Sequence, residues 1–306
     1  MNTNNTSMIR SPRGKNDLIF MGRVMGKVVS VLNMKGGVGK TTISAHVFRN
    51  FYFRRRKNVL LIDMDAQFNL TQAVIGRDQY EELVDEQRTI LRCFEPAPAD
   101  DFFKVKKSDS PPPDSTEIAK TLKRIKGGIP CRIDLIVGDF TLVKYSLIDD
   151  PQQLNVASTF FKRFINECKK RYDLIVLDCN PSSSFVTKCA LENSDAILSP
   201  VRPDRYSVLG IELVNKLLAH LKIAPPHYTV INGVQRGSSP SSAEAELRAH
   251  PIYGPNVLYE RLVYSRLLAA DPQYTGFATD KKVSWSGVLR REINALCDEI
   301  GTQLGV

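Results

Sequence analysis

The chain has 306 residues, of which 42% are hydrophobic and 25% are charged, and its formal net charge is +9 at pH 7. It is long enough for one large α/β domain or two small ones, and no apolar run reaches the length of about 18 residues that predicts a membrane-spanning helix. Six irregularly spaced cysteines and a polar N-terminus exclude a disulfide framework and a secretory signal, so we expect a cytoplasmic protein. The basic charge alone does not distinguish simple solubility from a polyanionic partner.

The predicted elements alternate along the chain. Residues 1–26 carry basic side chains without periodicity, which predicts a flexible basic arm. Apolar, β-branched runs predict buried strands at 27–33, 58–65, 133–139, 172–180, 195–201 and 227–233. Helices are expected at 41–57, 154–171, 183–193, 206–222 and 286–304. The expected fold class is therefore α/β: a mainly parallel twisted sheet flanked by helices, in a single P-loop domain over 27–306.

One segment interrupts this alternation. Residues 93–130 contain three consecutive prolines and a cluster of lysines. Proline and charge clusters are typical of irregular backbone, so we expect a Pro/Lys-rich loop or partly ordered insertion near 93–130. No internal repeat is present in the chain.

The stretch NMKGGVGKTT (33–42) lies between the first expected strand and the first expected helix. It is similar to the phosphate loop G-x-x-x-x-G-K-[ST], but Met34 occupies the position of the first glycine and Lys35 follows it. Glycines let the backbone curl around phosphates, and the helix N-terminus adds N–H donors. An ordinary Gly-rich turn is a weak alternative in this context. The loop residues expected to contact a nucleotide are Lys35, Gly36, Gly37, Val38, Gly39, Lys40, Thr41 and Thr42.

Three polar side chains are expected to complete the chemistry of this loop. Lys40 would neutralise the β- and γ-phosphates, and the Thr41 hydroxyl would ligate Mg²⁺. Asp178 is the last residue of the apolar run LIVLD. A carboxylate at the end of a strand beside the loop is suited to hold the metal's water shell. An aspartate at a strand end can also be a helix cap, and only its pairing with the loop favours metal binding.

Asp63 and Asp65 are two residues apart on a strand that is leaving the sheet. Both could reach the phosphate end of the site, one as a structural partner and the other to position an attacking water. The alternative for either residue is a cap on the following helix.

These pieces together resemble the ParA/MinD family of deviant Walker ATPases. The family loop K-G-G-x-G-K-[ST] is matched by KGGVGKT, and its second motif D-x-D-P-Q-G-N by DMDAQFN at 63–69. The resemblance extends over residues 27–303. Ala66 and Phe68 replace the family's Pro and Gly, and C-N-P-S-S-S follows Asp178, which leaves the turnover rate open.

The resemblance implies ATP and Mg²⁺ as cofactors, slow Mg²⁺-dependent ATP hydrolysis, and a homodimer that encloses two ATP molecules. Lys35 would then reach the partner's phosphates across the interface, in the manner of an arginine finger. Asp65 would orient the hydrolytic water and Asp178 would lie on the metal side. The segment 201–214, with Pro203, would line the dimer and adenine side, and Asn232 would read the adenine, although N-G-V replaces the usual N-M-x-D.

Members of this family differ in what the ATP dimer binds. The C-terminal helix 286–304 mixes acidic and basic residues and does not resemble a membrane anchor, and the cysteines do not form a cluster-binding segment. The stretch 257–277 resembles the ParA segment that supplies arginines to DNA. The DNA-binding candidates are Arg261, Arg266, Lys281 and Lys282, with solvated surface charge as the alternative for each.

The resemblance therefore implies a nucleoid-associated, cytoplasmic ParA-like ATPase that does not bind membrane. It would bind DNA without sequence preference and hydrolyse ATP when a ParB-like or cargo-adaptor protein stimulates it, to segregate or position a plasmid, chromosome or other cargo. The alternative is a ParA-like ATP switch that positions or regulates proteins without DNA. The two hypotheses share ATP-dependent dimerisation and differ in whether the dimer binds a duplex.

Overall fold

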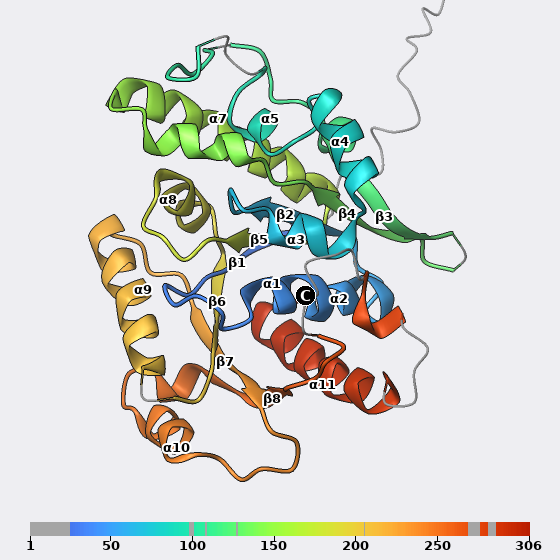
Figure 1. Cartoon of the computed structure of the whole chain (residues 1–306), viewed down its shortest axis with the longest axis vertical. Helices are drawn as coiled ribbons and strands as arrows, with labels where there is room; N and C mark the ends of the chain where they lie inside the picture. Colours follow the sequence, from blue (N-terminus) through green and yellow to red (C-terminus); the bar gives the residue numbers. More distant parts are fainter. Residues whose placement is uncertain are drawn as a thin grey trace, which may run out of the picture.

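The computed structural model describes residues 25–97, 101–107, 109–126, 128–204, 206–268, 276–280 and 286–306. The expected N-terminal arm, apart from its last two residues, lies outside them. Eight strands form one sheet in the order β3-β4-β2-β5-β1-β6-β7-β8 (Figure 1). Their bounds are β1 Lys27–Val31, β2 Val59–Met64, β3 Lys120–Ile125, β4 Cys131–Ile136, β5 Leu174–Cys179, β6 Ala196–Val201, β7 His227–Val234 and β8 Val257–Val263.

The sheet is parallel apart from the pairing of β3 with β4, which is antiparallel. β1 lies at its centre between β5 and β6. Val31 and Asp63 are both in register with Asp178, so the carboxyl ends of β1, β2 and β5 meet at one edge. In an open α/β sheet the crevice at this edge is the usual ligand site. The expected α/β fold class is confirmed.

Helices cover both faces of the sheet. Their bounds are α1 Lys40–Thr42, η2 Ile43–Val47, α2 Arg49–Phe53, α3 Asn69–Val74, α4 Arg77–Asp85, α5 Leu91–Phe94, α6 Ser115–Ile118, η3 Phe140–Ser146, α7 Pro151–Arg171, α8 Phe185–Glu192, α9 Ser207–Leu221, α10 Ser242–Ala249, η4 Gly254–Asn256, η5 Ala278–Asp280 and α11 Ser286–Leu304. The helix expected at 41–57 is present, but it contains a π-helical turn at η2 and ends at Phe53. Within the described residues, no helix combines the length and apolarity that crossing a membrane requires.

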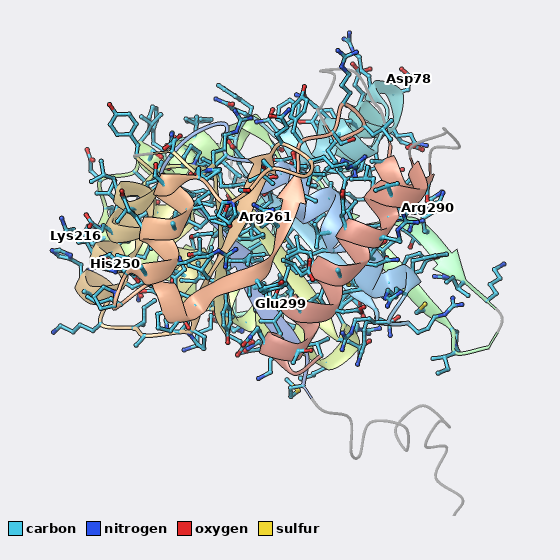
Figure 2. All side chains as sticks on the ribbon, turned by 90° about the horizontal axis from the view of Figure 1, so that it is seen from below. Asp78, Lys216, His250, Arg261, Arg290 and Glu299 are labelled. Carbon is cyan, nitrogen blue, oxygen red and sulfur yellow. The ribbon has the colours of Figure 1, made fainter. Side chains whose placement is uncertain are left out.

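Alternate residues of each central strand contact opposite layers of helices. Val29 and Val31 pack in one hydrophobic cluster with residues of α2 and α11, whereas Val28 packs in another with residues of α7, α8 and α9. α7, α8 and α9 therefore lie on one side of the sheet and α1, α2 and α11 on the other (Figure 1). Burial on both faces explains why the central strands appear as continuous apolar runs. From below, α11, which carries Arg290 and Glu299, lies beside β8, which carries Arg261 (Figure 2).

The segment expected as a loop or insertion near 93–130 has more structure than its composition indicates. It contains the second half of α5, all of α6 and the edge strand β3. Glu95 is fully buried, forms an ion pair with Lys144 and accepts hydrogen bonds from the Tyr145 hydroxyl and the Lys106 backbone N–H, both at 3.0 Å. A buried charge needs partners, and this network ties the segment to η3.

Candidate nucleotide-binding site

The loop between β1 and α1 has a backbone conformation that requires glycine. Gly37 and Gly39 have φ angles of 70° and 99°, in the left-handed region that other residues rarely adopt. A Cβ on Gly39 would lie 2.0 Å from Nδ2 of Asn232. That Nδ2 donates a 2.7 Å hydrogen bond to the carbonyl of Val38. Asn232 on β7 therefore braces the loop, a contact for which Gly39 leaves the space.

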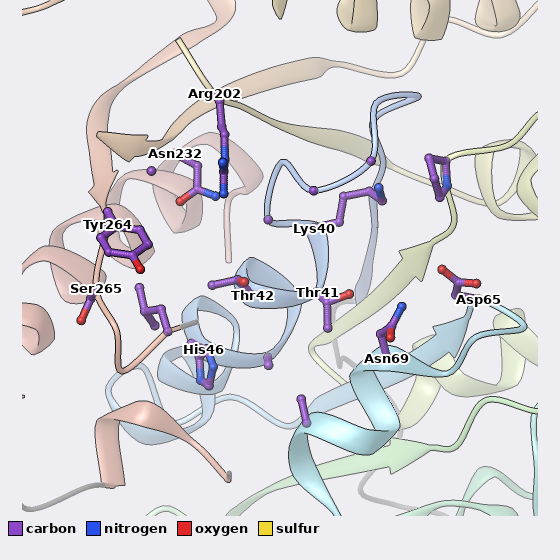
Figure 3. Close-up of a pocket in the computed structure, with 18 of the residues that line it drawn as sticks. Lys40, Thr41, Thr42, His46, Asp65, Asn69, Arg202, Asn232, Tyr264 and Ser265 are labelled. Atoms are coloured by element: carbon purple, nitrogen blue, oxygen red, sulfur yellow. The ribbon is translucent and has the colours of Figure 1, made fainter. Parts of the chain in front are cut away.

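This loop borders a cavity of about 540 Å³, a size typical of small-ligand sites. One end is lined by loop and helix residues together with Asp65 and Asn69, and the other by Arg202, Asn232 and Tyr264 (Figure 3). The cavity thus runs from the start of α1 to the end of β8. Of the expected nucleotide contacts, those that line it are Gly36, Gly37, Gly39, Lys40, Thr41, Thr42 and Asn232.

Asp178 organises the start of the helix. It accepts hydrogen bonds from the Thr41 hydroxyl at 2.9 Å and from the Ser44 hydroxyl at 2.7 Å. Burial raises the pKa of Asp178, and the two hydroxyl donors and Lys40 oppose that shift. Burial lowers the pKa of Lys40, and the nearby Asp178 and Asp65 oppose that shift. Ser44 was not predicted, although its position three residues after Thr41 places it on the same side of the helix.

The oxygen donors at this end suit Mg²⁺. Thr41 donates its hydroxyl hydrogen to Asp178, which leaves the lone pairs of its oxygen available to a cation. Within the described residues, no group of three or more His, Cys, Asp or Glu side chains could form a protein-only metal site. Mg²⁺ is commonly held by one or two protein oxygens together with substrate phosphates and waters, and Thr41 and Asp178 fit that pattern.

The structure separates Asp63 from Asp65. Asp63 is fully buried, and its Oδ2 accepts hydrogen bonds from the backbone N–H and the hydroxyl of Thr71, both at 2.8 Å. It does not line the cavity, so the expected nucleotide contact is corrected to a structural link between β2 and α3. Asp65 does line the cavity, and its Oδ1 accepts a 2.9 Å hydrogen bond from the Gln67 backbone N–H.

Lys35 points away from the cavity lining. Its Nζ lies 2.5 Å from Oδ2 of Asp204 and 5.7 Å from the centroid of the Tyr206 ring, and its side chain is 37% exposed. Pro203, also expected at the nucleotide, does not line the cavity, and its carbonyl accepts a 3.4 Å hydrogen bond from Ser241. In this single chain the extra lysine is therefore paired with the 201–214 segment.

The DNA-binding candidates have different surroundings. Arg261 pairs with Glu244 at 3.3 Å and donates to the Ser238 carbonyl at 3.0 Å. Glu244 is buried and also pairs with Arg248 at 3.0 Å. Arg261 therefore has a structural role beside Glu244, and its contact with DNA stays a prediction. Arg266 is exposed in the turn after β8, and Lys281 and Lys282 lie outside the described residues.

Comparison with known sequences matches the part of the chain that holds the site. A family model described as an AAA domain matches residues 26–225, which include the loop, Asp65 and Asp178. The sporulation initiation inhibitor protein Soj of Bacillus subtilis is 30% identical over 209 residues, 66% of this chain and 68% of that protein.

Solved structures share the fold. A putative plasmid partition protein from Borrelia burgdorferi, bound to AMPPNP, has 19% identity and a TM-score of 0.58, with 90% of this chain and 99% of that chain covered. The structure of pNOB8 ParA bound to nonspecific DNA has 19% identity and a TM-score of 0.62, with 92% and 99% covered. Because the sequence identities are this low, the two comparisons show a shared fold and not a shared role.

Proposed function

Because the chain belongs to the ParA-type branch of the AAA-domain family of P-loop ATPases, we propose that it binds ATP with Mg²⁺ in the cavity beside α1 and hydrolyses it slowly. One observation carries this proposal: Lys40, the Thr41–Asp178 hydrogen bond and Asp65 border the same cavity end, at the carboxyl ends of β1, β2 and β5. The AMPPNP bound to the Borrelia partition protein, which shares the fold, supports this choice of ligand.

Each side chain at this end has a distinct task. The backbone N–H groups of the loop and the Lys40 ammonium would hold the β- and γ-phosphates. The Thr41 hydroxyl would ligate Mg²⁺, with Asp178 orienting that hydroxyl. Mg²⁺, when bound, supplies charge neutralisation at the phosphate oxygens. Asp65 would orient the water that attacks the γ-phosphate, because it lines the same end of the cavity as Lys40 and Thr41 (Figure 3).

Lys35 would act in trans. Its pairing with Asp204 holds it outside its own cavity, and two ATP-bound chains facing each other would exchange this contact for the partner's phosphates. Each site would then be complete only in the dimer. ATP binding is in this way coupled to dimerisation.

The dimer would bind duplex DNA without sequence preference, near the nucleoid, and a ParB-like or cargo-adaptor protein would stimulate hydrolysis and release. The net charge of +9 and the exposed Arg266 support this assignment, and so does the nonspecific DNA bound to pNOB8 ParA. The process served would be segregation or positioning of a plasmid, chromosome or other cargo.

The test uses an Asp65→Ala variant, which should retain ATP without hydrolysing it. Sedimentation and duplex binding are measured with ATP, ADP or no nucleotide, over a salt series. We expect a dimer with ATP alone, and duplex affinity of that dimer that falls steeply with salt. Dimerisation without duplex affinity at any salt would contradict the DNA assignment and support a protein-positioning switch. No ATP-dependent dimer would contradict the proposal as a whole.

A further inference from the structure

The hairpin of β3 and β4 concentrates basic charge at one edge of the sheet. β3 is the outermost strand and pairs only with β4, so its other edge faces outward. Figure 1 shows the hairpin projecting from the side of the molecule. Residues 120–132 contain no acidic side chain and five basic ones: Lys120, Lys123, Arg124, Lys126 and Arg132.

Two of these charges are neutralised within the chain. Lys123 pairs with Asp280 at 3.4 Å, and Arg132 pairs with Asp134 at 2.8 Å. Arg124 and Lys126 are exposed and form no ion pair with any residue that the structure describes. Lys120, partly exposed at the start of β3, also forms no ion pair with a described residue, so two of the three unpaired charges lie towards the projecting end of the hairpin.

The register of the hairpin places like charges together. Arg124 lies directly opposite Arg132 in the antiparallel pairing. Like charges at such positions destabilise a hairpin. Charged side chains on an edge strand also prevent association with other strands, but that purpose does not require two arginines opposite each other. Arg132 is neutralised by Asp134 and donates to the Tyr172 hydroxyl at 3.1 Å, so Arg124 is the member of this pair whose charge remains available to an external anion.

A second basic segment precedes β2 and lies beside the start of β4. Residues 54–57 are Arg-Arg-Arg-Lys, and Asn58, which follows them, accepts a 3.3 Å hydrogen bond from the Arg132 backbone N–H. Asp298 pairs with Arg54 and Arg55. Arg56 is exposed and Lys57 is partly exposed. The turn therefore extends the basic surface beyond the hairpin.

We propose that this basic hairpin surface, made of Arg56, Lys57, Arg124 and Lys126, contacts the phosphates of duplex DNA. The inference rests on the proposed function and assigns to it a surface that the sequence resemblance did not indicate. A projecting group of exposed cations suits an extended polyanion, whose phosphates it can contact one by one.

The experiment compares two double variants with equal changes in net charge. Arg124→Glu/Lys126→Glu alters the hairpin, and Lys107→Glu/Lys162→Glu alters two exposed lysines, one in the loop before α6 and one at the middle of α7. Duplex affinity is measured in the Asp65→Ala background with ATP over a salt series. The hairpin variant should bind at least about tenfold more weakly at low salt, and its log Kd against log salt slope should fall by about 0.9 for each lost phosphate contact. The control variant should retain most of both values.

The measurements distinguish the proposed DNA-binding function from the proposed contact of the hairpin with DNA. ATP-dependent dimerisation should be unchanged in both variants, because neither pair of residues lies at the cavity. If the unaltered protein binds no duplex, the proposed DNA function is contradicted. If it binds duplex and the hairpin and control variants match it in affinity and slope, the hairpin inference is overturned. An Arg124→Gln/Lys126→Gln variant, which should show about half the effect by removing rather than reversing charge, covers the case in which charge reversal prevents folding.

Discussion

At the scale of single residues, the site depends on side chains whose roles cannot be told from their type. Asp63 and Asp65 are two residues apart, yet one is buried against Thr71 and the other lines the cavity. Arg261 and Arg266 are five residues apart, and one pairs with a buried glutamate while the other is exposed. The sequence predicted site roles for Lys40, Thr41 and Asp178 because the phosphate loop and the end of an apolar strand define the positions of these residues. The others depend on tertiary neighbours that no local pattern contains.

An Arg261→Ala substitution should destabilise the fold. The truncation leaves Glu244 buried with Arg248 as its remaining arginine, so we expect a loss of about 2 kcal/mol in the free energy of unfolding. Urea denaturation measures this loss. Arg266→Ala is the matched control, expected to change stability by less than about 0.5 kcal/mol while weakening duplex binding at low salt. The account of Arg261 is wrong if its truncation leaves stability intact and weakens DNA binding.

At the scale of elements, apolar strands were predictable and polar ones were not. The strands at the centre of the sheet are buried on both faces and show up as continuous apolar runs. β3 has the sequence KTLKRI on an exposed edge, with a register irregularity between Thr121 and Lys123, so its alternation is lost. Proline and lysine content in the same segment suggested a loop, although Glu95 and Lys144 anchor it through contacts far apart in sequence.

A Lys144→Met substitution tests that anchor. It would leave the Glu95 carboxylate buried with only neutral hydrogen-bond donors, and breaking a buried pair in this way costs about 3–5 kcal/mol. Urea denaturation should show this loss, with faster proteolysis in the 95–107 segment. Replacing both residues together, as Glu95→Gln/Lys144→Met, should recover part of the stability. Equal stability of the single variant and the native chain would show that the pair does not hold the segment.

His227 joins three elements and should make stability depend on pH. Its ring nitrogens contact Ser199 of β6 and Asn215 of α9, and burial lowers its pKa to about 4 from 6.5. The unfolded chain therefore takes up a proton near pH 6.5 before the folded chain does, so stability should fall as pH drops from 6.5 towards 4, by up to about 3 kcal/mol. Urea denaturation of a His227→Gln variant should lack this part of the pH dependence. An unchanged pH profile would contradict the assignment.

At the scale of the whole molecule, the proposed function requires a nucleotide site that is complete only in a dimer. The cavity holds Lys40, Thr41 and Asp65, whereas Lys35 is outside its lining and pairs with Asp204. The sequence resemblance predicted a lysine delivered across a dimer. That delivery stays a prediction, and in the single chain Lys35 is paired with Asp204. In the proposed DNA-bound dimer, the basic hairpin surface at the sheet edge would give each chain a DNA-binding region separate from the cavity.

Mixing two inactive variants tests this account most directly. Lys35→Ala lacks the lysine delivered to the partner, and Asp65→Ala lacks the aspartate that orients water, so each alone should have little ATPase activity. In a mixed dimer, the site of the Lys35→Ala chain keeps its own Asp65 and receives Lys35 from the partner. The mixture should therefore recover up to about a quarter of native ATPase activity, since half of the dimers are mixed and each has one complete site. A mixture as inactive as its components would contradict delivery of Lys35 across the dimer.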